Sequence, residues 1–541
     1  MALIQPLSAK AAALGIAPQH VIAYGADKLK VSLDALSHQP LRGKLILVSA
    51  LTPTPAGEGK TTLCIGLAQG LQQIGQSVAL ALRQPSMGPV FGRKGGATGG
   101  GKSRLTPSES INLHFTGDFH AITSAHNLLA SVVDNALYQK ATRLDPGRVL
   151  WKRVLDVNDR ALRTICIGRG GGGIERETGF DITAASEVMA VLCLSESLAD
   201  LRARLKRMVM GFDAQGDAVL ADEFRVTGAL VALLRDALLP NLVQSMEGVP
   251  AFVHGGPFAN IAHGCNSVLA TRMALAHADF AVTEAGFAFD LGGEKFIHIK
   301  CRQSGLEPSV IVIVATVRAL KMHGSVALDA LAQTDVGAVE RGLPNLAAHL
   351  DAASRFQRPV IVALNQFTHD SREELDAVHR FCATRGVPCA TANVFGEGGA
   401  GALTIAELVV QAAEVESPPL PFLYELHEPV PIKLHSIATK VYGAEGVTLT
   451  SAAMEKLAAF EKAEFTRLPL CMAKTQNSLS DDASKRGRPQ GFHITVRDFE
   501  IANGAGFLVA LTGSMMRMPA LPKVPAAERV DVDANGRIVG V

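Results

Sequence analysis

Apolar runs and helix-spaced leucines alternate along the first third of the chain. The run Leu45–Val48 is continuous, which is typical of a strand that is covered on both faces of a sheet. A glycine-rich turn follows, and then Leu63, Leu67 and Leu71 recur at the spacing of one helix face. Val78–Leu82 has the pattern of the next strand. This order predicts a βαβ unit and therefore a parallel sheet.

Further buried strands are expected later in the sequence, at Thr164–Ile167, Val310–Val317 and Val360–Leu364. The segments that follow them are polar or glycine-rich: Gly168–Gly173, Arg318 onward, and Asn365–Asp370. Ligands of open α/β sheets bind where the strands end, so these segments are candidate site loops. Prolines interrupt the pattern at Glu416–Pro421, where we expect a break.

The composition is that of an ordinary globular protein. Of 541 residues, 48% are hydrophobic and 19% are charged, and the formal net charge is +1. A chain this close to neutral has no overall field that would select nucleic acid or an anionic membrane, so we expect neither partner. A local basic site for a phosphate or a carboxylate is compatible with this balance.

The cysteines and the apolar segments favour a cytoplasmic protein. None of the eight cysteines forms a C-x-x-C pair, and residues such as Cys64 and Cys166 lie in apolar patterns, which favours reduced thiols. The N-terminal residues do not have the pattern of a signal peptide. The most apolar stretch, Ser309–Val317, is far shorter than the ~20 residues of a membrane span.

The strongest local motif is TPTPAGEGKTT, Thr52–Thr62, between a predicted strand and a predicted helix. This is the context of a phosphate-binding loop, in which glycines let backbone N–H groups approach phosphate oxygens at a helix N-terminus. Lys60 adds a full positive charge, and the hydroxyl of Thr61 can bind Mg²⁺. The residues expected to bind the phosphates of ATP are Thr54, Pro55, Ala56, Gly57, Glu58, Gly59, Lys60, Thr61 and Thr62.

This loop is a variant, because Thr54 stands where the standard pattern has glycine. The alternative interpretation is a glycine turn before an amphipathic helix, with Lys60 in solvent. The guanine-reading pattern Asn-Lys-x-Asp is not found at Asn365, which is followed by Gln366. We therefore favour ATP over GTP. A second glycine-rich segment, Phe91–Gly101, has six glycines among its eleven residues and is either a flexible linker or backbone held close to a ligand.

Seven longer segments resemble the formate–tetrahydrofolate ligase family and follow the family's order over nearly the whole chain. They are Thr52–Thr62, GPVFGRKGGATGGG (Gly88–Gly101), INLHFTGDFHAITSAHNLL (Ile111–Leu129), GFDITAASEVMAVLCL (Gly179–Leu194), PAFVHGGPFANIAHGCNS (Pro250–Ser267), VATVRALKMHG (Val314–Gly324) and LCMAKTQNSLSDD (Leu470–Asp482). The resemblance implies that ATP activates formate as formyl phosphate, which then formylates tetrahydrofolate. Lys60 would hold the transferring phosphate, Arg83 would bind formate and then formyl phosphate, and Asp118 would assist proton removal.

The family stacks the folate ring between aromatic side chains, which correspond here to Phe287, Phe367 and Phe395. Without the resemblance, core packing would be the better interpretation of each phenylalanine. This chain departs from the family pattern in four places. Phe395 replaces Trp, Thr368 replaces Pro, Gln84 replaces Glu, and the usual GGEG is shifted to EGGAG at Glu397–Gly401. Most of these departures fall on the folate side, and they indicate a differently tuned or weaker folate pocket.

A metal cluster is not expected. His114, His120 and His126 are six residues apart and do not share one helix face. His254, His263 and Cys265 would suit zinc, but the resemblance places their loop around the active site without a structural metal. The resemblance also implies Mg²⁺ with ATP, activation by K⁺ or NH₄⁺, and a homotetramer.

The expected fold is α/β, a phosphate-loop type of parallel sheet with flanking helices and two further α/β domains. The expected domains are residues 1–92 with 279–348 for nucleotide binding, 93–278 for active-site loops, and 349–541 for the folate-binding aromatic residues. Two alternatives stay open at this point. One is a variant phosphate-loop ATPase of a regulatory or metal-chaperone type, and the other is a ligase homologue with an altered folate pocket.

Overall fold

The computed structural model describes residues 6–37, 39–92, 96–513 and 515–540. Its largest element within these residues is a mixed sheet with seven parallel strands at its centre. In spatial order these are β15 (Pro250–Val253), β4 (Val78–Leu82), β16 (Phe280–Glu284), β3 (Lys44–Ala50), β17 (Val310–Ala315), β18 (Val360–Asn365) and β19 (Cys389–Ala392). The expected βαβ unit is confirmed as β3, α2 (Lys60–Gln73) and β4, and the strands expected at Val310–Val317 and Val360–Leu364 are confirmed as β17 and β18.

The sheet continues beyond β15 with antiparallel strands. These are β14 (Asn241–Ser245), β2 (Leu29–Val31) and β1 (Val21–Ala23), and β6 (Ser103–Thr106) also pairs with β14 and with β5 (Gly99–Gly100). The large sheet therefore takes strands from all three segments of the expected division. That division stays a proposal.

Helices cover both faces of the parallel strands. Successive side chains of a strand point to opposite faces, so each strand contributes to two apolar cores. Ile46 and Val48 of β3 pack in a core with α2 and α15 (Leu403–Ala413). Leu45 and Leu47 pack in the core of the other face, with α9 (Val268–His277), α11 (Val317–His323) and α12 (Val336–Ser354). A strand that is apolar at every position is thus explained by burial on both faces.

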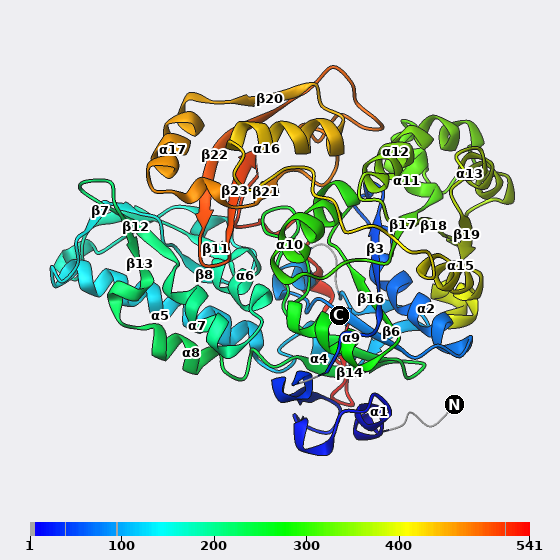
Figure 1. The fold of residues 1–541 in the computed structure, drawn as a ribbon, viewed down its shortest axis with the longest axis horizontal. Helices are drawn as coiled ribbons and strands as arrows, with labels where there is room; N and C mark the ends of the chain where they lie inside the picture. The colour runs from blue at the N-terminus through cyan, green and yellow to red at the C-terminus, as the bar shows by residue number, and fades with distance from the viewer. Residues whose placement is uncertain (1–5, 38, 93–95, 514, 541) are drawn as a thin grey trace.

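Two further lobes flank this sheet (Figure 1). One contains α5 (Asp118–Tyr138), α6 (Glu187–Leu194), α7 (Leu198–Lys206) and α8 (Thr227–Leu234), with a small sheet of β7 (Leu144–Val149), β12 (Val209–Asp213) and β13 (Ala218–Leu220) and the pair β8 (Arg153–Leu155) and β11 (Phe180–Ile182). The other contains α16 (Val430–Ile437), α17 (Ser451–Lys462) and a sheet of β20 (Gly446–Leu449), β22 (His493–Ala502), β23 (Phe507–Thr512) and β21 (Leu470–Ala473).

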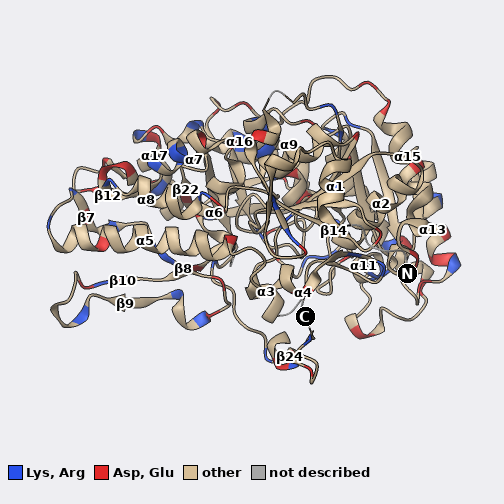
Figure 2. Ribbon diagram, turned by 90° about the horizontal axis from the view of Figure 1, so that it is seen from below, with Lys and Arg blue, Asp and Glu red and all other residues tan. Residues whose placement is uncertain are grey.

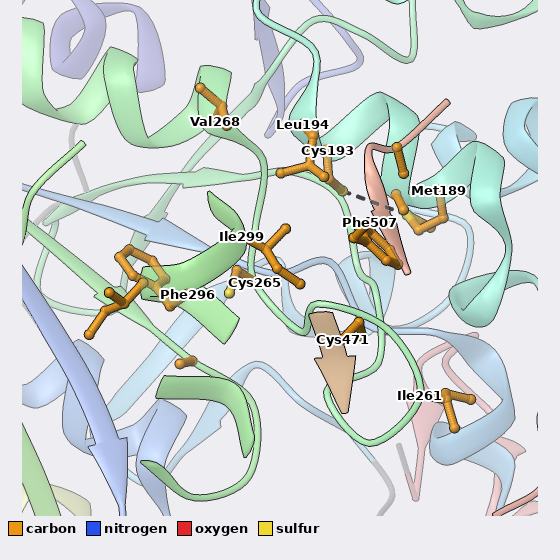
Figure 3. Packing of buried hydrophobic residues seen from close by; sticks show 14 of the residues in the cluster. Met189, Cys193, Leu194, Ile261, Cys265, Val268, Phe296, Ile299, Cys471 and Phe507 are labelled. Atoms are coloured by element: carbon orange, nitrogen blue, oxygen red, sulfur yellow. Dashed lines mark hydrogen bonds between the residues drawn. The ribbon is translucent and has the colours of Figure 1, made fainter. Parts of the chain in front are cut away.

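One apolar core joins these lobes to the large sheet. Figure 3 shows Met189 and Cys193 of α6 beside Cys265, Cys471 of β21 and Phe507 of β23. These side chains are all within one cluster of buried residues, although they come from distant parts of the sequence. One continuous core therefore supports the two lobes and the large sheet together.

The strand predicted at Thr164–Ile167 is present, but the prediction that it is buried was wrong. β9 (Ile165–Ile167) pairs only in a two-stranded antiparallel ribbon with β10 (Arg176–Thr178), and Figure 2 shows this ribbon on the outside of the molecule. The thiol of Cys166 is exposed there, contrary to the apolar surroundings expected for it. A short apolar run does not show what covers it, and here the strand is flanked by two short 3₁₀ helices, Arg160–Arg163 and Arg169–Gly171, in place of long helices that could cover it.

The remaining elements connect these layers. They include α1 (Leu7–Ala13), α3 (Met87–Phe91), α4 (Ser108–Asn112), α10 (Arg302–Ser304), α13 (Arg372–Thr384), α14 (Val394–Glu397), β24 (Asp531–Val532) and β25 (Ile538–Val539). The break expected at Glu416–Pro421 is confirmed, because α15 ends at Ala413 and α16 begins at Val430. Within the described ranges, each helix is too short or too polar to cross a bilayer.

Candidate active site

The loops that follow the parallel strands meet at one edge of the large sheet. The phosphate loop follows β3, Arg83 follows β4, Glu284 ends β16, Thr316 follows β17 and Asn365 ends β18. Their strands are neighbours and run in the same direction. These five positions therefore gather at the edge of the sheet where open α/β proteins bind ligands.

The backbone of the phosphate loop is shaped by one turn and two glycines. The N–H of Gly57 donates to the carbonyl of Thr54 at 2.9 Å, which closes the turn at Pro55–Ala56. Gly57 and Gly59 have φ values of 79° and 68°, in the left-handed region that favours glycine. Helix α2 begins at the next residue, Lys60, so its free N–H groups and partial positive charge point into the loop.

The side chain of Glu58 holds this loop from inside the protein. Oε1 of Glu58 accepts two hydrogen bonds from Thr54, one from its N–H at 2.6 Å and one from its hydroxyl at 2.7 Å. Its Oε2 accepts from the hydroxyl of Thr316 and lies 3.5 Å from Nε of Arg318. A phosphate contact by Glu58 would therefore have to come from its backbone.

Two side chains from the candidate site loops that follow predicted strands complete this support. Arg318 donates to the carbonyl of Gly57, and Nδ2 of Asn365 donates to the carbonyl of Glu58 at 3.0 Å. Both follow strands that the sequence predicts, but their partners lie 261 and 307 positions away in the chain. Their position at a strand end predicted a site loop, but the sequence did not predict these partners.

Lys60 and Arg83 lie on either side of the end of β16. Nζ of Lys60 donates to the carbonyl of Phe287 at 2.6 Å. Nη2 of Arg83 lies 3.5 Å from Oε1 of Glu284, and Nη1 donates to the carbonyl of Pro257 at 3.4 Å. Nε of Arg83 is buried without a hydrogen-bond partner among the described residues. These long contacts leave the guanidinium with donors for an anion.

Glu284 links the two sides of this site. Its Oε2 accepts a hydrogen bond from the hydroxyl of Thr61 at 2.9 Å, while its Oε1 faces Arg83. The neighbouring thiol of Cys64 is an unsuitable nucleophile, because burial raises its pKa well above the ordinary value and the charge of Glu284 adds to this effect. The only sequence signal for Glu284 is an acidic residue at the end of an apolar strand.

Asp118 begins α5 and is buried in a polar network. Its Oδ1 accepts from Nζ of Lys30 at 2.9 Å, and its Oδ2 accepts from Nδ2 of Asn241 at 2.6 Å. The next residue, Phe119, packs where the loops after β4 and β15 meet, since a Cβ at Gly256 would lie 2.9 Å from its Cζ. The N-terminus of α5 therefore abuts the site, with both oxygens of Asp118 engaged.

The three aromatic residues expected to bind folate all border the phosphate loop. Phe287 supplies the carbonyl that Lys60 binds, and it does so with a φ of 57°, a conformation that is costly for a bulky side chain. One face of the Phe367 ring is covered by the guanidinium of Arg318, 4.0 Å from the ring centroid. A Cβ at Gly59 would lie 3.9 Å from Cζ of Phe367.

Phe395, by contrast, is 62% exposed, which excludes core packing for its ring. It lies against the glycine-rich segment: a Cβ at Gly100 would be 3.0 Å from its Cε2 and 3.9 Å from Oγ1 of Thr62. The N–H of Lys102 also donates to the carbonyl of Phe395 at 3.0 Å. The backbone of Gly100 is thus packed against Phe395, whereas residues 93–95 of this segment lie outside the described residues.

Three of the histidines considered as metal ligands are dispersed in the structure. His114 and His120 are exposed, and His126 stacks on Trp151 with ring centroids 4.2 Å apart. Burial lowers the pKa of His126 to about 3, so this ring is neutral. Among the described residues there is no group of three or more His, Cys, Asp or Glu that could hold a metal ion.

A C-terminal segment also reaches the phosphate loop, and the sequence did not predict this contact. Nδ2 of Asn345 donates to the carbonyl of Gly487 at 2.8 Å and to the hydroxyl of Thr52 at 3.1 Å. His323 lies between the N–H of Gly487 and the carbonyl of Thr52, at 3.1 and 2.9 Å. The chain that follows the family-like segment Leu470–Asp482 therefore contacts Asn345 and His323, which in turn hold Thr52 at the start of this loop.

The site combines a phosphate loop, an arginine with unused donors and exposed aromatic surface at one sheet edge. The family model described as formate–tetrahydrofolate ligase matches residues 1–541, the full length of the sequence. This family forms a carbon–nitrogen bond by formylating tetrahydrofolate with formate and ATP, which the site geometry suits. The chain belongs to the formate–tetrahydrofolate ligase family.

Proposed function

We propose that Lys60 and Arg83 assemble the reacting anions of this ligase and that the reaction passes through formyl phosphate. The single observation that carries the proposal is the placement of the two cations on either side of the end of β16. Formate and the γ-phosphate of ATP are both anions, so their approach requires positive charge and alignment.

In the first step an oxygen of formate attacks the γ-phosphorus, and the bond to the leaving oxygen of ADP breaks. Arg83 grips the formate with two parallel hydrogen bonds, for which its donors are suited. Lys60, the loop amides and the N-terminus of α2 stabilise the charge on the transferred phosphoryl group. Glu58 keeps the loop in shape through Thr54 and Thr316.

In the second step the 10-position nitrogen of tetrahydrofolate attacks the formyl carbon. Phosphate leaves with the electron pair of the broken carbon–oxygen bond, and the nitrogen loses a proton. Phe287, Phe367 and Phe395 provide the surface for the folate ring. The resemblance to the family assigns proton removal to Asp118. The ion pair of Asp118 with Lys30 supports a second role, which is to stabilise the fold at the start of α5.

Mg²⁺ fits the hydroxyl oxygen of Thr61, a hard ligand of the kind that this ion prefers. The proton of this hydroxyl is donated to Oε2 of Glu284 at 2.9 Å, which leaves the lone pairs of the oxygen for the ion. Bound with ATP, this ion would neutralise phosphate charge. The proposal also includes activation by K⁺ or NH₄⁺, to which no residue is assigned, a homotetramer and a cytoplasmic location, all supported by membership of the family.

Transfer of labelled oxygen tests the intermediate. If formate attacks ATP, one oxygen-18 atom from doubly labelled formate is expected in each phosphate released. The measurement is mass spectrometry of the phosphate in a complete reaction, with omission of tetrahydrofolate as the control. Formation of 10-formyltetrahydrofolate with unlabelled phosphate would exclude formyl phosphate and the roles given to Lys60 and Arg83.

Phe395 gives a second prediction, because this residue departs from the family's Trp. A larger ring offers more stacking surface, and aromatic pairs contribute about 0.5–1.5 kcal/mol beyond area burial. We expect Phe395→Trp to lower the KM for tetrahydrofolate by a few-fold, and Phe395→Ala to raise it about tenfold, with kcat nearly unchanged because the ring contacts ground and transition states alike.

Steady-state kinetics with each substrate varied in turn measures this. The KM values for ATP and formate should stay the same. Tyr138→Ala removes another exposed aromatic side chain, 48% exposed at the end of α5, and serves as the matched control. A parental tetrahydrofolate KM in Phe395→Ala would show that the folate platform lies elsewhere.

A further inference from the structure

Glu284 is a buried carboxylate that the proposed chemistry leaves without a part of its own in catalysis. It exposes only 4% of its surface, and it contacts both sides of the site. We propose that Glu284 is a positioning residue that fixes Arg83, and with it formate, relative to the phosphate loop. This inference rests on the roles proposed above for Arg83 and Thr61.

The register of the sheet gives Glu284 this position. Strand β16 lies between β4 and β3, with Thr283 opposite Ala81 of β4 and Glu284 opposite Val48 of β3. Arg83 follows β4 directly, and the phosphate loop follows β3. A long side chain at the end of the middle strand therefore reaches both neighbours. One oxygen of Glu284 takes the hydroxyl of Thr61 and the other faces the guanidinium of Arg83.

Charge alone argues against a carboxylate at this place. A negative charge beside the arginine that binds formate repels formate, so its removal should tighten formate binding if charge were all that mattered. Placement argues the other way. The contact of Arg83 with Pro257 is long, at 3.4 Å, and its Nε is buried without a partner among the described residues. Glu284 is thus the charged anchor of the guanidinium, and the two arguments predict opposite signs.

Two substitutions separate placement from charge. Glu284→Gln removes the charge, and its amide can accept from Thr61 or from Arg83 but not from both, because one end is an NH₂ group. Glu284→Asp keeps the charge but is shorter by one methylene group, so it cannot span both partners. If Glu284 acts by placement, both variants should bind formate less well, although only one of them changes the charge.

We expect each variant to raise the KM for formate about tenfold and to lower kcat about 10- to 100-fold, since displacement of a reacting group by 1 Å can cost about 100-fold in rate. The KM for Mg·ATP should change by less than threefold, and the thermal midpoint should stay near the parental value. Glu187→Gln is the matched control. This control makes the same substitution at another buried carboxyl. Burial raises the pKa of Glu187 to about 7, so this carboxyl is already partly protonated at neutral pH.

A formate KM that falls or stays the same in Glu284→Gln would overturn the inference, as would parental kinetics in Glu284→Asp. A change confined to the KM for Mg·ATP would also overturn it, because Glu284 would then act on the metal–nucleotide complex. Uniform loss of folded protein without a formate effect would indicate a merely structural role.

Arg83→Ala distinguishes a failure of this inference from a failure of the proposed site. If Arg83→Ala leaves the formate KM unchanged, the assignment of Arg83 itself is wrong. If Arg83→Ala raises the formate KM and the Glu284 variants do not, only the role of Glu284 is wrong. If Glu284 acts through Arg83, the double variant Arg83→Ala, Glu284→Gln should bind formate no worse than Arg83→Ala alone, because effects of coupled residues are not additive.

Discussion

Replacing Lys60 with alanine is expected to lower turnover about 100- to 1000-fold, the range for loss of one preorganised contact to developing charge. Lys60 is the first residue of α2, where the helix N-terminus already favours anions. Its Nζ is held 2.6 Å from the carbonyl of Phe287, next to Thr61 and the loop glycines. Its charge should act mainly on the transferring phosphoryl group, so kcat should fall more than the KM for ATP rises.

The measurement is kcat from the formation of ADP and 10-formyltetrahydrofolate at saturating substrates, with the thermal midpoint as a check on folding. Lys44→Ala is the matched control, because Lys44 is exposed at the opposite end of the same strand, β3. It should leave kcat unchanged. Near-parental turnover in a folded Lys60→Ala protein would show that this loop is not the catalytic phosphate site.

The sequence was sufficient for those parts of the fold that local pattern determines. The apolar runs at Leu45–Val48 and Val78–Leu82 became β3 and β4, and the glycines at positions 57 and 59 have the positive φ that a phosphate loop needs. Both signals are contained in a few consecutive residues. The run at Thr164–Ile167 was misjudged for the same reason, since a short apolar segment does not reveal whether helices will cover it.

The parts of the site that the sequence could not supply are contacts between distant segments. Glu284, Arg318 and Asn365 reach the phosphate loop only because β16, β17 and β18 lie beside β3 in the sheet. Gly487 and Thr52, which are also far apart in the sequence, are linked through Asn345 and His323. Such partners are set by strand order and packing, which motif spacing does not encode.

Residue identity also failed to show what a side chain contacts. Glu58 lies within the phosphate loop, yet its carboxylate is buried and accepts from Thr54 and Thr316. Asp118 was expected near the reacting nitrogen, and the structure shows both of its oxygens engaged by Lys30 and Asn241. Because both oxygens of Asp118 already accept hydrogen bonds, its part in the reaction is decided by a separate test.

Lys30→Met is expected to destabilise the protein by about 3–5 kcal/mol, the cost of breaking a buried ion pair so that one charge stays unpaired. Lys30 and Asp118 have side-chain exposures of 1% and 3%, so water cannot replace the lost partner. Asp118→Asn should be destabilising as well, because it leaves the ammonium of Lys30 with the carbonyl of Leu239, 3.2 Å away, in place of a charge. The double variant removes both charges and should regain most of the stability.

Urea and thermal midpoints of the four proteins measure this cycle, and turnover of the double variant then decides the part that Asp118 plays. Loss of a proton acceptor costs about 100- to 10,000-fold in rate, even in a well-folded enzyme. We expect the double variant to stay within about tenfold of parental kcat, because the amide introduced by Asp118→Asn can still accept from Asn241 and keep the start of α5 against the site. A stable double variant with turnover lowered by more than about 100-fold would instead show that the Asp118 carboxylate takes the proton.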